Sequence, residues 1–228
     1  KVEEPGGGRN GSGGAQESAP GEYTLRRIHP RENTAQENAM SRASSPLKMS
    51  LAEYMEWEPL QTEKHEYWDG HVYSQAGGSR KHSLVGANLL GEVRAILKGH
   101  PCEAHGSDLR IDIRATGYQA YPDLSVVCPS VEGDSDHVIS NPVLIAEVLS
   151  PSTEDFDRGT KFGHYRTIES LQEYLVLWQD MAKLELHTKT PEGYWLLREM
   201  IGIDQSVSLA SLGGAKLALV DIYDHIQL

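Results

Sequence analysis

Long apolar runs and cysteines are scarce in this sequence of 228 residues. It contains no run of about 18 apolar residues, so we expect no membrane-spanning helix. Its N-terminus also lacks the apolar core of a secretory signal. The two cysteines, Cys102 and Cys128, have no spacing typical of a metal or redox site. This pattern favours a cytoplasmic protein in a reducing compartment.

Basic residues are outnumbered by acidic ones, and the formal net charge is −12 at pH 7. Residues 1–48 hold seven Lys and Arg against six Asp and Glu, which leaves 14 basic and 27 acidic residues in 49–228. Such a surface repels polyanions except at a local basic groove or a bound metal cation. We therefore expect any DNA binding to be weak and confined to one cleft.

Large apolar residues are nearly absent from the start of the chain, "KVEEPGGGRNGSGGAQESAPG", which is rich in Gly, Ser, Pro and Glu. A segment of this composition cannot offset the entropy lost when it becomes ordered. We interpret 1–48 as a flexible N-terminal extension and 49–228 as one domain. An amphipathic pattern opens at Met49, and Met49 or Met40 is the candidate native start.

The hydrophobic periodicity of residues 49–228 predicts a single α/β or α+β unit. A short helix at 50–58 is followed by a hairpin that turns at Asp69-Gly70, and then by a second helix at 81–99. Next we expect three strands, a helix that Ser152 or Thr153 can cap, a fourth strand, and a hairpin around Pro191 to Gly193. The three strands are 102–115, 121–128 and 142–150. The helix is 152–168, the fourth strand 173–178 and the hairpin 183–200.

Two carboxylates interrupt apolar strands: Asp123 in "YPDLSVVC" and Glu147 in "PVLIAEVLS". Burying a carboxylate without a partner costs several kcal/mol, roughly, and two neighbouring carboxylates repel each other unless a cation lies between them. Mg²⁺ or Mn²⁺ suits such a position, because these ions bind carboxylate oxygens and keep waters for a substrate. Asp108, near the preceding strand, is expected to add a third oxygen to the metal site.

The helix predicted at 152–168 carries Lys161 and Tyr165, which lie four residues apart and therefore share a face. A lysine ammonium beside metal-bound carboxylates can orient an attacking water or neutralise charge that develops on a phosphate. Lys161 thus joins Asp123 and Glu147 as a catalytic candidate, and Tyr165 is a supporting one.

Each catalytic candidate also has a structural interpretation. Pro-Asp is common in turns, which fits Asp123. Glu147 fits a buried ion pair with Lys161 or Arg166. Lys161 follows Asp157 by four residues, the spacing of a helix-surface pair worth a few tenths of a kcal/mol, roughly. Taken jointly, and in this order along the chain, the residues favour a metal site.

Tyr165 by itself fits a half-buried core aromatic, and His82 fits a surface histidine at the start of a helix. Glu66 and Glu92 are further acidic candidates near the first hairpin and the helix that follows it. None of the histidines has the spacing of a zinc site.

Four segments, taken together, resemble the Uma-type restriction-endonuclease-like family, a bacterial family of the PD-(D/E)XK nuclease superfamily that was long catalogued as a domain of unknown function. The segments are "EKHEYWDGHVY", "RKHSLVGANL", "YPDLSVVC" and "AEVLSPSTEDFDRGTKFGHYR", and the match covers roughly residues 49–225. The resemblance implies a restriction-endonuclease-like α-β-β-β-α-β core, which is a mixed sheet flanked by helices, with extra β-hairpins. It also implies a divalent-metal site and phosphodiester hydrolysis.

Within this resemblance, Pro122-Asp123 corresponds to the "PD" and Glu147 to the "(D/E)" of the superfamily signature. Leu149 stands where the lysine of the signature is expected, so the strict motif is broken and the resemblance transfers the basic role to Lys161. His82 matches a histidine often found at this point of the family, so it is a second supporting candidate.

The sequence therefore predicts a Mg²⁺-dependent (or Mn²⁺-dependent) endonuclease acting on DNA in a local cleft. A catalytically inactive nuclease-fold module for DNA or protein interaction is the alternative, and a hydrolase of smaller phosphoesters is a third. Apolar strands near both ends are compatible with a homodimer.

Overall fold

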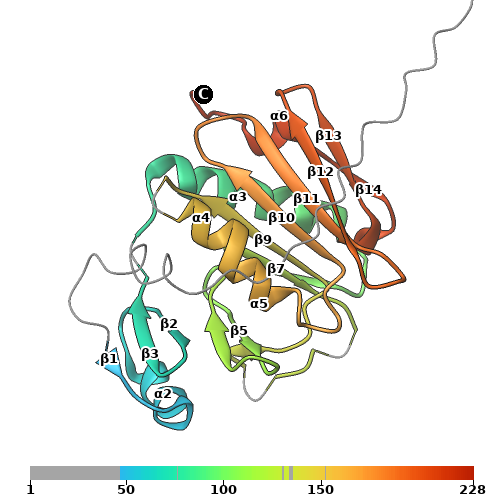
Figure 1. Cartoon of the computed structure of the whole chain (residues 1–228). Coiled ribbons are helices and arrows are strands. Elements are labelled where there is room, and N and C mark those ends of the chain that lie inside the picture. The colour runs from blue at the N-terminus through green and yellow to red at the C-terminus, as the bar shows by residue number, and fades with distance from the viewer. Residues whose placement is uncertain (1–46, 76, 130, 134–135, 152) are drawn as a thin grey trace, which may run out of the picture.

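The computed structural model describes residues 47–228 apart from 76, 130, 134, 135 and 152. Two six-stranded sheets dominate it (Figure 1). We call the sheet with the order β12-β11-β10-β9-β7-β4 the central sheet, and the sheet with the order β1-β3-β2-β6-β5-β8 the N-terminal sheet. The central strands are Glu103–Gly106 (β4), Leu124–Val127 (β7), Leu144–Leu149 (β9), Glu173–Trp178 (β10), Lys183–Lys189 (β11) and Trp195–Ile201 (β12).

The N-terminal sheet is built from short strands around one tight hairpin. Its strands are Leu47–Lys48 (β1), His65–Trp68 (β2), His71–Ser74 (β3), Arg110–Ile113 (β5), Tyr118–Ala120 (β6) and Val138–Ile139 (β8). Asp69 and Gly70 join β2 to β3, and both have positive φ angles, 48° and 81°. Two such residues in a two-residue turn match the right-handed twist of the strands, so the predicted Asp-Gly hairpin is confirmed.

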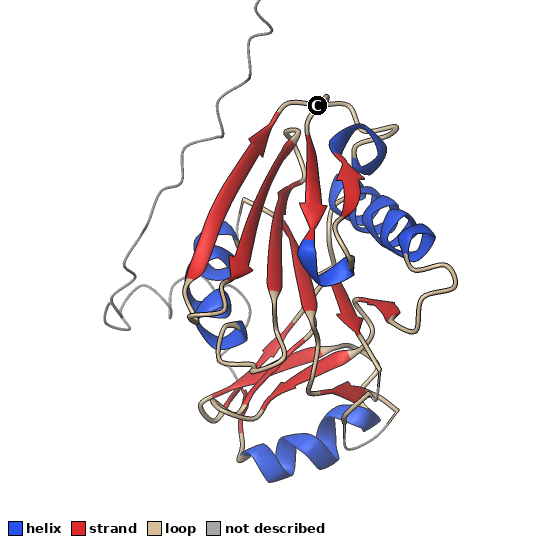
Figure 2. Ribbon diagram, turned by 90° about the vertical axis from the view of Figure 1, so that its right-hand side faces the viewer, coloured by secondary structure: helices blue, strands red, loops and turns tan. Residues whose placement is uncertain are grey.

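Helices cover both faces of the central sheet (Figure 2). The helical elements are Leu51–Trp57 (α2), Glu58–Leu60 (η1), Arg80–Ile96 (α3), Glu154–Phe156 (α4), Asp157–Lys161 (η2), Phe162–Tyr165 (α5), Ala210–Leu212 (η3) and Leu219–Ile222 (α6). Serines begin two of them: Ser50 forms a capping box with Glu53, and the Ser79 hydroxyl accepts the backbone N–H of His82. These caps satisfy N–H groups that a helix start otherwise leaves unpaired.

Two hydrophobic clusters fix the layers. On one face of the central sheet, α3 packs with α6 and the C-terminal hairpin of Ser206–Leu209 (β13) and Ala215–Ala218 (β14). On the other face, α4, η2 and α5 pack between the central sheet and strands β5 and β6 of the N-terminal sheet. The segment from α4 to α5 is therefore buried where it faces the two sheets, and Asp157, Lys161 and Tyr165 lie on this buried side.

The predicted α-β-β-β-α-β core is confirmed, in the order α3, β4, β7, β9, α4–α5, β10. Strands β4, β7 and β9 pair antiparallel, and β10 runs parallel to β9 after the helical crossover. Together with the hairpins at both ends, this gives the expected mixed α+β architecture.

One predicted strand, 102–115, is wrong. Residues 103–106 form β4 in the central sheet, whereas 110–113 form β5 in the N-terminal sheet, and the chain turns between them. The apolar alternation continues through the turn, so a pattern of period two cannot reveal that the two halves pair with different sheets. Asp108 lies in this turn and not in a core strand.

The boundary expected at residue 48 also shifts. Leu47 and Lys48 pair with His71 and Val72 of β3, so strand pairing begins two residues earlier than expected. The remainder of the expected extension, 1–46, lies outside the described residues, as does Ser152. Thr153 is the residue that precedes α4.

The two cysteines form a disulfide, which the sequence did not lead us to expect. Cys102 precedes β4 and Cys128 follows β7, and because Glu103 pairs with Val127 the cysteines are the next opposite pair along this antiparallel ladder. Their separation of 26 residues in sequence hides this proximity. Within the described part of the chain, none of the helices combines the length and apolarity needed to cross a membrane.

Removing the disulfide should destabilise the protein. The bond closes a loop with a sequence separation of 26 residues, and a loop of this size corresponds to about 3 kcal/mol of unfolding free energy. We expect a reducing agent, or the double substitution Cys102→Ser and Cys128→Ser, to lower the free energy of unfolding in denaturant titrations. The double variant should no longer respond to reductant. Equal stability of the oxidised and reduced wild type would contradict a bonded pair.

Candidate active site

The two acids that interrupt apolar strands point to the same face of the central sheet. Leu124 of β7 pairs with Ala146 of β9, so Asp123 stands opposite Glu147. Directly opposite residues of an antiparallel pair share a face, as the sequence interpretation required. The backbone N–H of Val148 also donates to Asp123 Oδ2 at 2.7 Å, which fixes the Asp123 carboxylate against the neighbouring strand.

The ammonium of Lys161 reaches this pair of acids from the helical crossover. Its Nζ lies 2.9 Å from Glu147 Oε1, and the lysine is only 5% exposed. Lys161 ends the π-helical turn η2, and such wider turns are frequent at functional sites. The surface-pair interpretation of Lys161 is therefore wrong, because Asp157 Oδ1, at 3.7 Å, is a more distant partner inside a buried cluster. The buried ion pair between Glu147 and Lys161 is confirmed.

Tyr165 lies one helical turn beyond Lys161 and contacts the same acid. Its hydroxyl donates to Glu147 Oε1 at 2.8 Å, and its side chain is fully buried. The spacing of four residues therefore brings both groups onto Glu147, as expected from the shared helix face.

Glu66 completes the cluster, although the sequence indicated it only as a secondary acidic candidate. It lies on β2 of the N-terminal sheet, and its Oε1 is 3.0 Å from Lys161 Nζ. The same signal that marked Glu147, an acid within a short apolar strand, also marks "HEYW". The sequence could not show that two different sheets meet at one lysine. Glu92, on α3, is partly buried and makes no contact with this cluster among the interactions of the described residues.

His82 lies at the exposed end of the site. Its Nε2 is 3.3 Å from Asp123 Oδ2, and the side chains of His82 and Asp123 are 22% and 18% exposed, against 7% for Lys161. Gly78 permits this position, because a Cβ on Gly78 would lie 2.7 Å from His82 Nδ1. A substrate would therefore meet Asp123 and His82 before the buried groups.

The electrostatics of the cluster leave an excess of negative charge. Burial raises the pKa of the Glu147 carboxyl well above its usual value; Lys161 opposes this shift, and the carboxylates of Asp157 and Asp123 add to it. Burial alone lowers the pKa of Lys161, but Glu147 and Glu66 outweigh it and keep the ammonium charged. Three acids, Glu147, Glu66 and Asp157, lie within 3.7 Å of one ammonium, so the charge balance favours uptake of protons or of a further cation.

The described residues contain no ready-made metal cage: none of their His, Cys, Asp and Glu side chains gather in a group of three that could hold an ion. Asp108 is not brought to the cluster, because its fully exposed side chain pairs with Lys64 at 3.1 Å. Asp123 and Glu147 remain as two oxygen donors on adjacent strands. Mg²⁺ is commonly held by one or two carboxylates with several waters, so this donor pair fits the ion.

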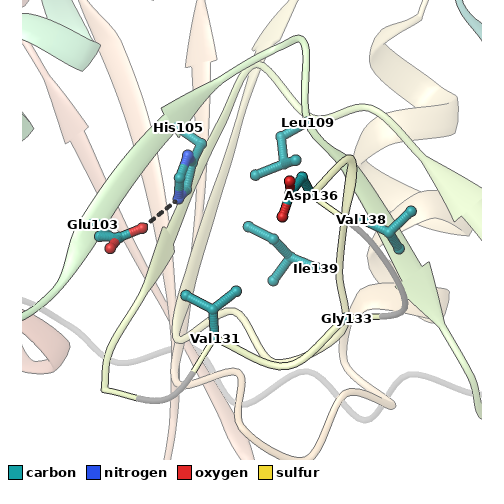
Figure 3. A pocket seen from close by; sticks show the side chains of 8 residues that line it. All are labelled: Glu103, His105, Leu109, Val131, Gly133, Asp136, Val138 and Ile139. Carbon is teal, nitrogen blue, oxygen red and sulfur yellow. Dashed lines mark ion pairs between the residues drawn. The ribbon is translucent and has the colours of Figure 1, made fainter.

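A pocket of about 440 Å³ lies elsewhere, at the edge of the central sheet (Figure 3). It is lined by β4, β8 and the segment that precedes β8, and includes His105, Asp136 and Ile139. We call Glu66, Asp123, Glu147, Asp157, Lys161 and Tyr165 the Lys161 cluster. None of these residues lines the pocket, so the pocket and the cluster are separate features.

His82 should give the metal-free protein a measurable pH dependence. The hydrogen bond to Asp123 raises the pKa of His82 above its usual 6.5. The stabilisation is therefore fully present below about pH 6.5 and is lost as the pH rises through the higher folded pKa. NMR titration in the presence of chelator should give a His82 pKa above 6.5 that falls in Asp123→Asn. His225→Ala serves as the control and should leave the pKa of His82 unchanged, because the His225 side chain is 86% exposed and pairs with Asp224. A His82 pKa unchanged by Asp123→Asn would contradict the contact.

Comparison with known proteins agrees with this architecture. The chain is 40% identical over 166 residues to the uncharacterized protein slr1290 of Synechocystis sp., an alignment that covers 73% of this chain and 87% of the relative. It is 35% identical over 164 residues to the uncharacterized protein sll1609 of the same organism, covering 71% and 93%. A crystal structure described as "a putative nuclease belonging to DUF820" from Anabaena variabilis has the same fold, with a TM-score of 0.63 at 18% identity over 77% of this chain and 97% of that one.

A family model described as "Uma2: Putative restriction endonuclease" matches residues 51–220, which include the central sheet, the N-terminal sheet apart from β1, and every residue of the Lys161 cluster. The predicted resemblance is confirmed, and the chain belongs to the Uma2 family.

Proposed function

We propose that this protein is an endonuclease that hydrolyses phosphodiester bonds in DNA with the help of Mg²⁺ or Mn²⁺. The observation that carries the proposal is the meeting of three groups from separate segments: Asp123, directly before β7, stands opposite Glu147 of β9, and Lys161 reaches Glu147 from the helical crossover. Membership of a restriction-endonuclease-like family supports the same reaction class.

Asp123 and Glu147 are the residues that would hold the ion, since they stand directly opposite each other on neighbouring segments and the cluster carries excess negative charge. When bound, such an ion polarises a phosphoryl oxygen and lowers the pKa of a water molecule. The residues already hold their carboxylates in defined orientations, through Val148 N–H on Asp123 and the Tyr165 hydroxyl on Glu147.

Lys161 takes the role that the family signature gives to the lysine two residues after the glutamate. Leu149 occupies that position and is buried in the apolar cluster beside α4 and α5. The ammonium of Lys161 nevertheless lies 2.9 Å from Glu147. The helical turn η2 therefore brings a positive charge to the acid that the signature lysine would accompany. In this position it can orient the attacking oxygen and stabilise charge that develops on the phosphate.

The substrate would approach from the side of Asp123 and His82, where the cluster is partly exposed. Arg80 and Lys81 precede His82 at the start of α3 and place positive charge on this side of the molecule. The net charge of −12 opposes DNA elsewhere on the surface. Binding is therefore expected to be weak, sensitive to salt and confined to this region.

A catalytically inactive module is the second candidate, and one observation favours it. Lys161 is already paired with two carboxylates, so the cluster is a complete ion-pair network without any metal. A buried network of this kind can persist in a fold for structural reasons alone.

Plasmid cleavage separates the two candidates. We expect the wild type to nick or cut plasmid DNA with Mg²⁺ or Mn²⁺ and not with chelator. Asp123→Asn, Glu147→Gln and Lys161→Met should each lower the rate by about 100-fold, the scale for loss of one group that stabilises the transition state. Asp108→Asn is the control that should keep the wild-type rate, because its side chain is fully exposed and pairs with Lys64.

Equal inactivity of the wild type and Asp123→Asn with both metals would support the inactive module. Circular dichroism and thermal unfolding of each variant show whether a lost rate reflects a lost fold. Cleavage of small phosphodiesters without cleavage of plasmid would instead favour a hydrolase of smaller substrates.

A further inference from the structure

We propose that Glu66 is a positioning residue that keeps the ammonium of Lys161 in the site when the carboxylate of Glu147 binds a metal ion. This inference rests on the proposed function and assigns a role to the N-terminal sheet.

A metal ion on Glu147 would share this carboxylate with the partners that it already has. Glu147 Oε1 accepts both the Lys161 ammonium, at 2.9 Å, and the Tyr165 hydroxyl, at 2.8 Å. A divalent ion on the same carboxylate would compete with the ammonium and repel it. Lys161 is 5% exposed, and a buried charge that loses its partner is strongly destabilised. A second anion is therefore needed for Lys161 to remain in place.

Glu66 meets this need, because it holds Lys161 at 3.0 Å independently of Glu147. The carboxylate is itself fixed by hydrogen-bond donors alone: the Tyr118 hydroxyl on Oε2 at 2.6 Å, and Gln75 Nε2 and the Tyr121 N–H on Oε1 at 2.9 and 3.0 Å. Donors on both oxygens leave Glu66 little freedom to turn towards a metal ion.

Asp157 is the other acid near the ammonium, and it is less suited to this role. Its Oδ1 lies 3.7 Å from Lys161 Nζ, beyond hydrogen-bond distance, and it belongs to the same helical turn as the lysine. Glu66 instead comes from β2, so it ties the crossover to a different sheet. The N-terminal sheet thus takes part in the site through one carboxylate.

A double-mutant cycle between Glu66 and Lys161 tests the proposal. We expect Glu66→Gln to lower kcat for plasmid cleavage by about tenfold or more at saturating Mn²⁺, because an amide gives Lys161 no charge and presents an N–H₂ group to a set of donors. In the Lys161→Met background, the same substitution should change the residual kcat by less than about twofold, since Glu66 acts through the lysine. Equal effects in both backgrounds would overturn the proposal.

Glu58→Gln is the matched control. Glu58 is also a buried glutamate beside the N-terminal sheet, and it accepts hydrogen bonds from the His65 N–H and the Tyr121 hydroxyl, but it has no contact with Lys161 among the interactions of the described residues. We expect it to lower the melting temperature while kcat stays within about threefold of the wild type. If Glu66→Gln does not fold, Glu66→Asp keeps the charge on a shorter side chain, and its kcat should lie between those of wild type and Lys161→Met; a wild-type kcat would overturn the proposal.

Calorimetric binding of Mn²⁺ gives a readout that does not depend on cleavage. Without Glu66, Lys161 has Glu147 as its nearest anion, so Glu66→Gln should weaken Mn²⁺ binding by about fivefold or more, and much less in the Lys161→Met background. Cleavage by the wild type with no Glu66 effect on either readout would overturn the role of Glu66 and leave the proposed function intact. A wild type that neither cleaves DNA nor binds Mn²⁺ would overturn both.

Discussion

The buried ammonium of Lys161 is the constraint around which the rest of the structure is arranged. An ammonium this deeply buried is tolerated only where carboxylates surround it, and here they come from β9 of the central sheet, β2 of the N-terminal sheet and the same helical turn. Because each acid belongs to a different element, the lysine holds the two sheets and the crossover together. The same arrangement leaves more negative than positive charge, which makes the cluster suited to a further cation.

The packing layers explain why this position can be both stable and accessible. One side of the segment from α4 to α5 packs against apolar side chains of both sheets, and Lys161 and Tyr165 are buried there. Asp123 and His82 lie at the margin of that buried region and remain partly exposed. The proposed hydrolysis needs both kinds of group. Partly exposed groups let the substrate enter, and buried groups keep their charges in a poorly hydrated environment, where electrostatic interactions are stronger.

The function proposed for this member of the Uma2 family depends on the position of charges in space more than on the letters of a motif. Leu149 breaks the superfamily signature in sequence, yet Lys161 brings an ammonium to Glu147 from the next element. Lys161 ends the π-helical turn of the crossover that joins the parallel strands β9 and β10, and this crossover places its ammonium beside Glu147. Glu66 then adds a contact that no motif of the core strands contains.

The sequence by itself determined the local structure and marked Asp123 and Glu147 as the acids that interrupt apolar strands. Apolar periodicity, the Asp69-Gly70 turn and the four-residue spacing of Lys161 and Tyr165 are short-range signals, and each is decided by neighbours a few residues away. Only the tertiary structure decided that 102–115 divides between two sheets, that Cys102 meets Cys128, that Asp108 stays in solvent, and that Glu66 reaches Lys161. Those outcomes depend on contacts between segments distant in the chain, because strand alternation records which face is buried but not which strand lies beside it.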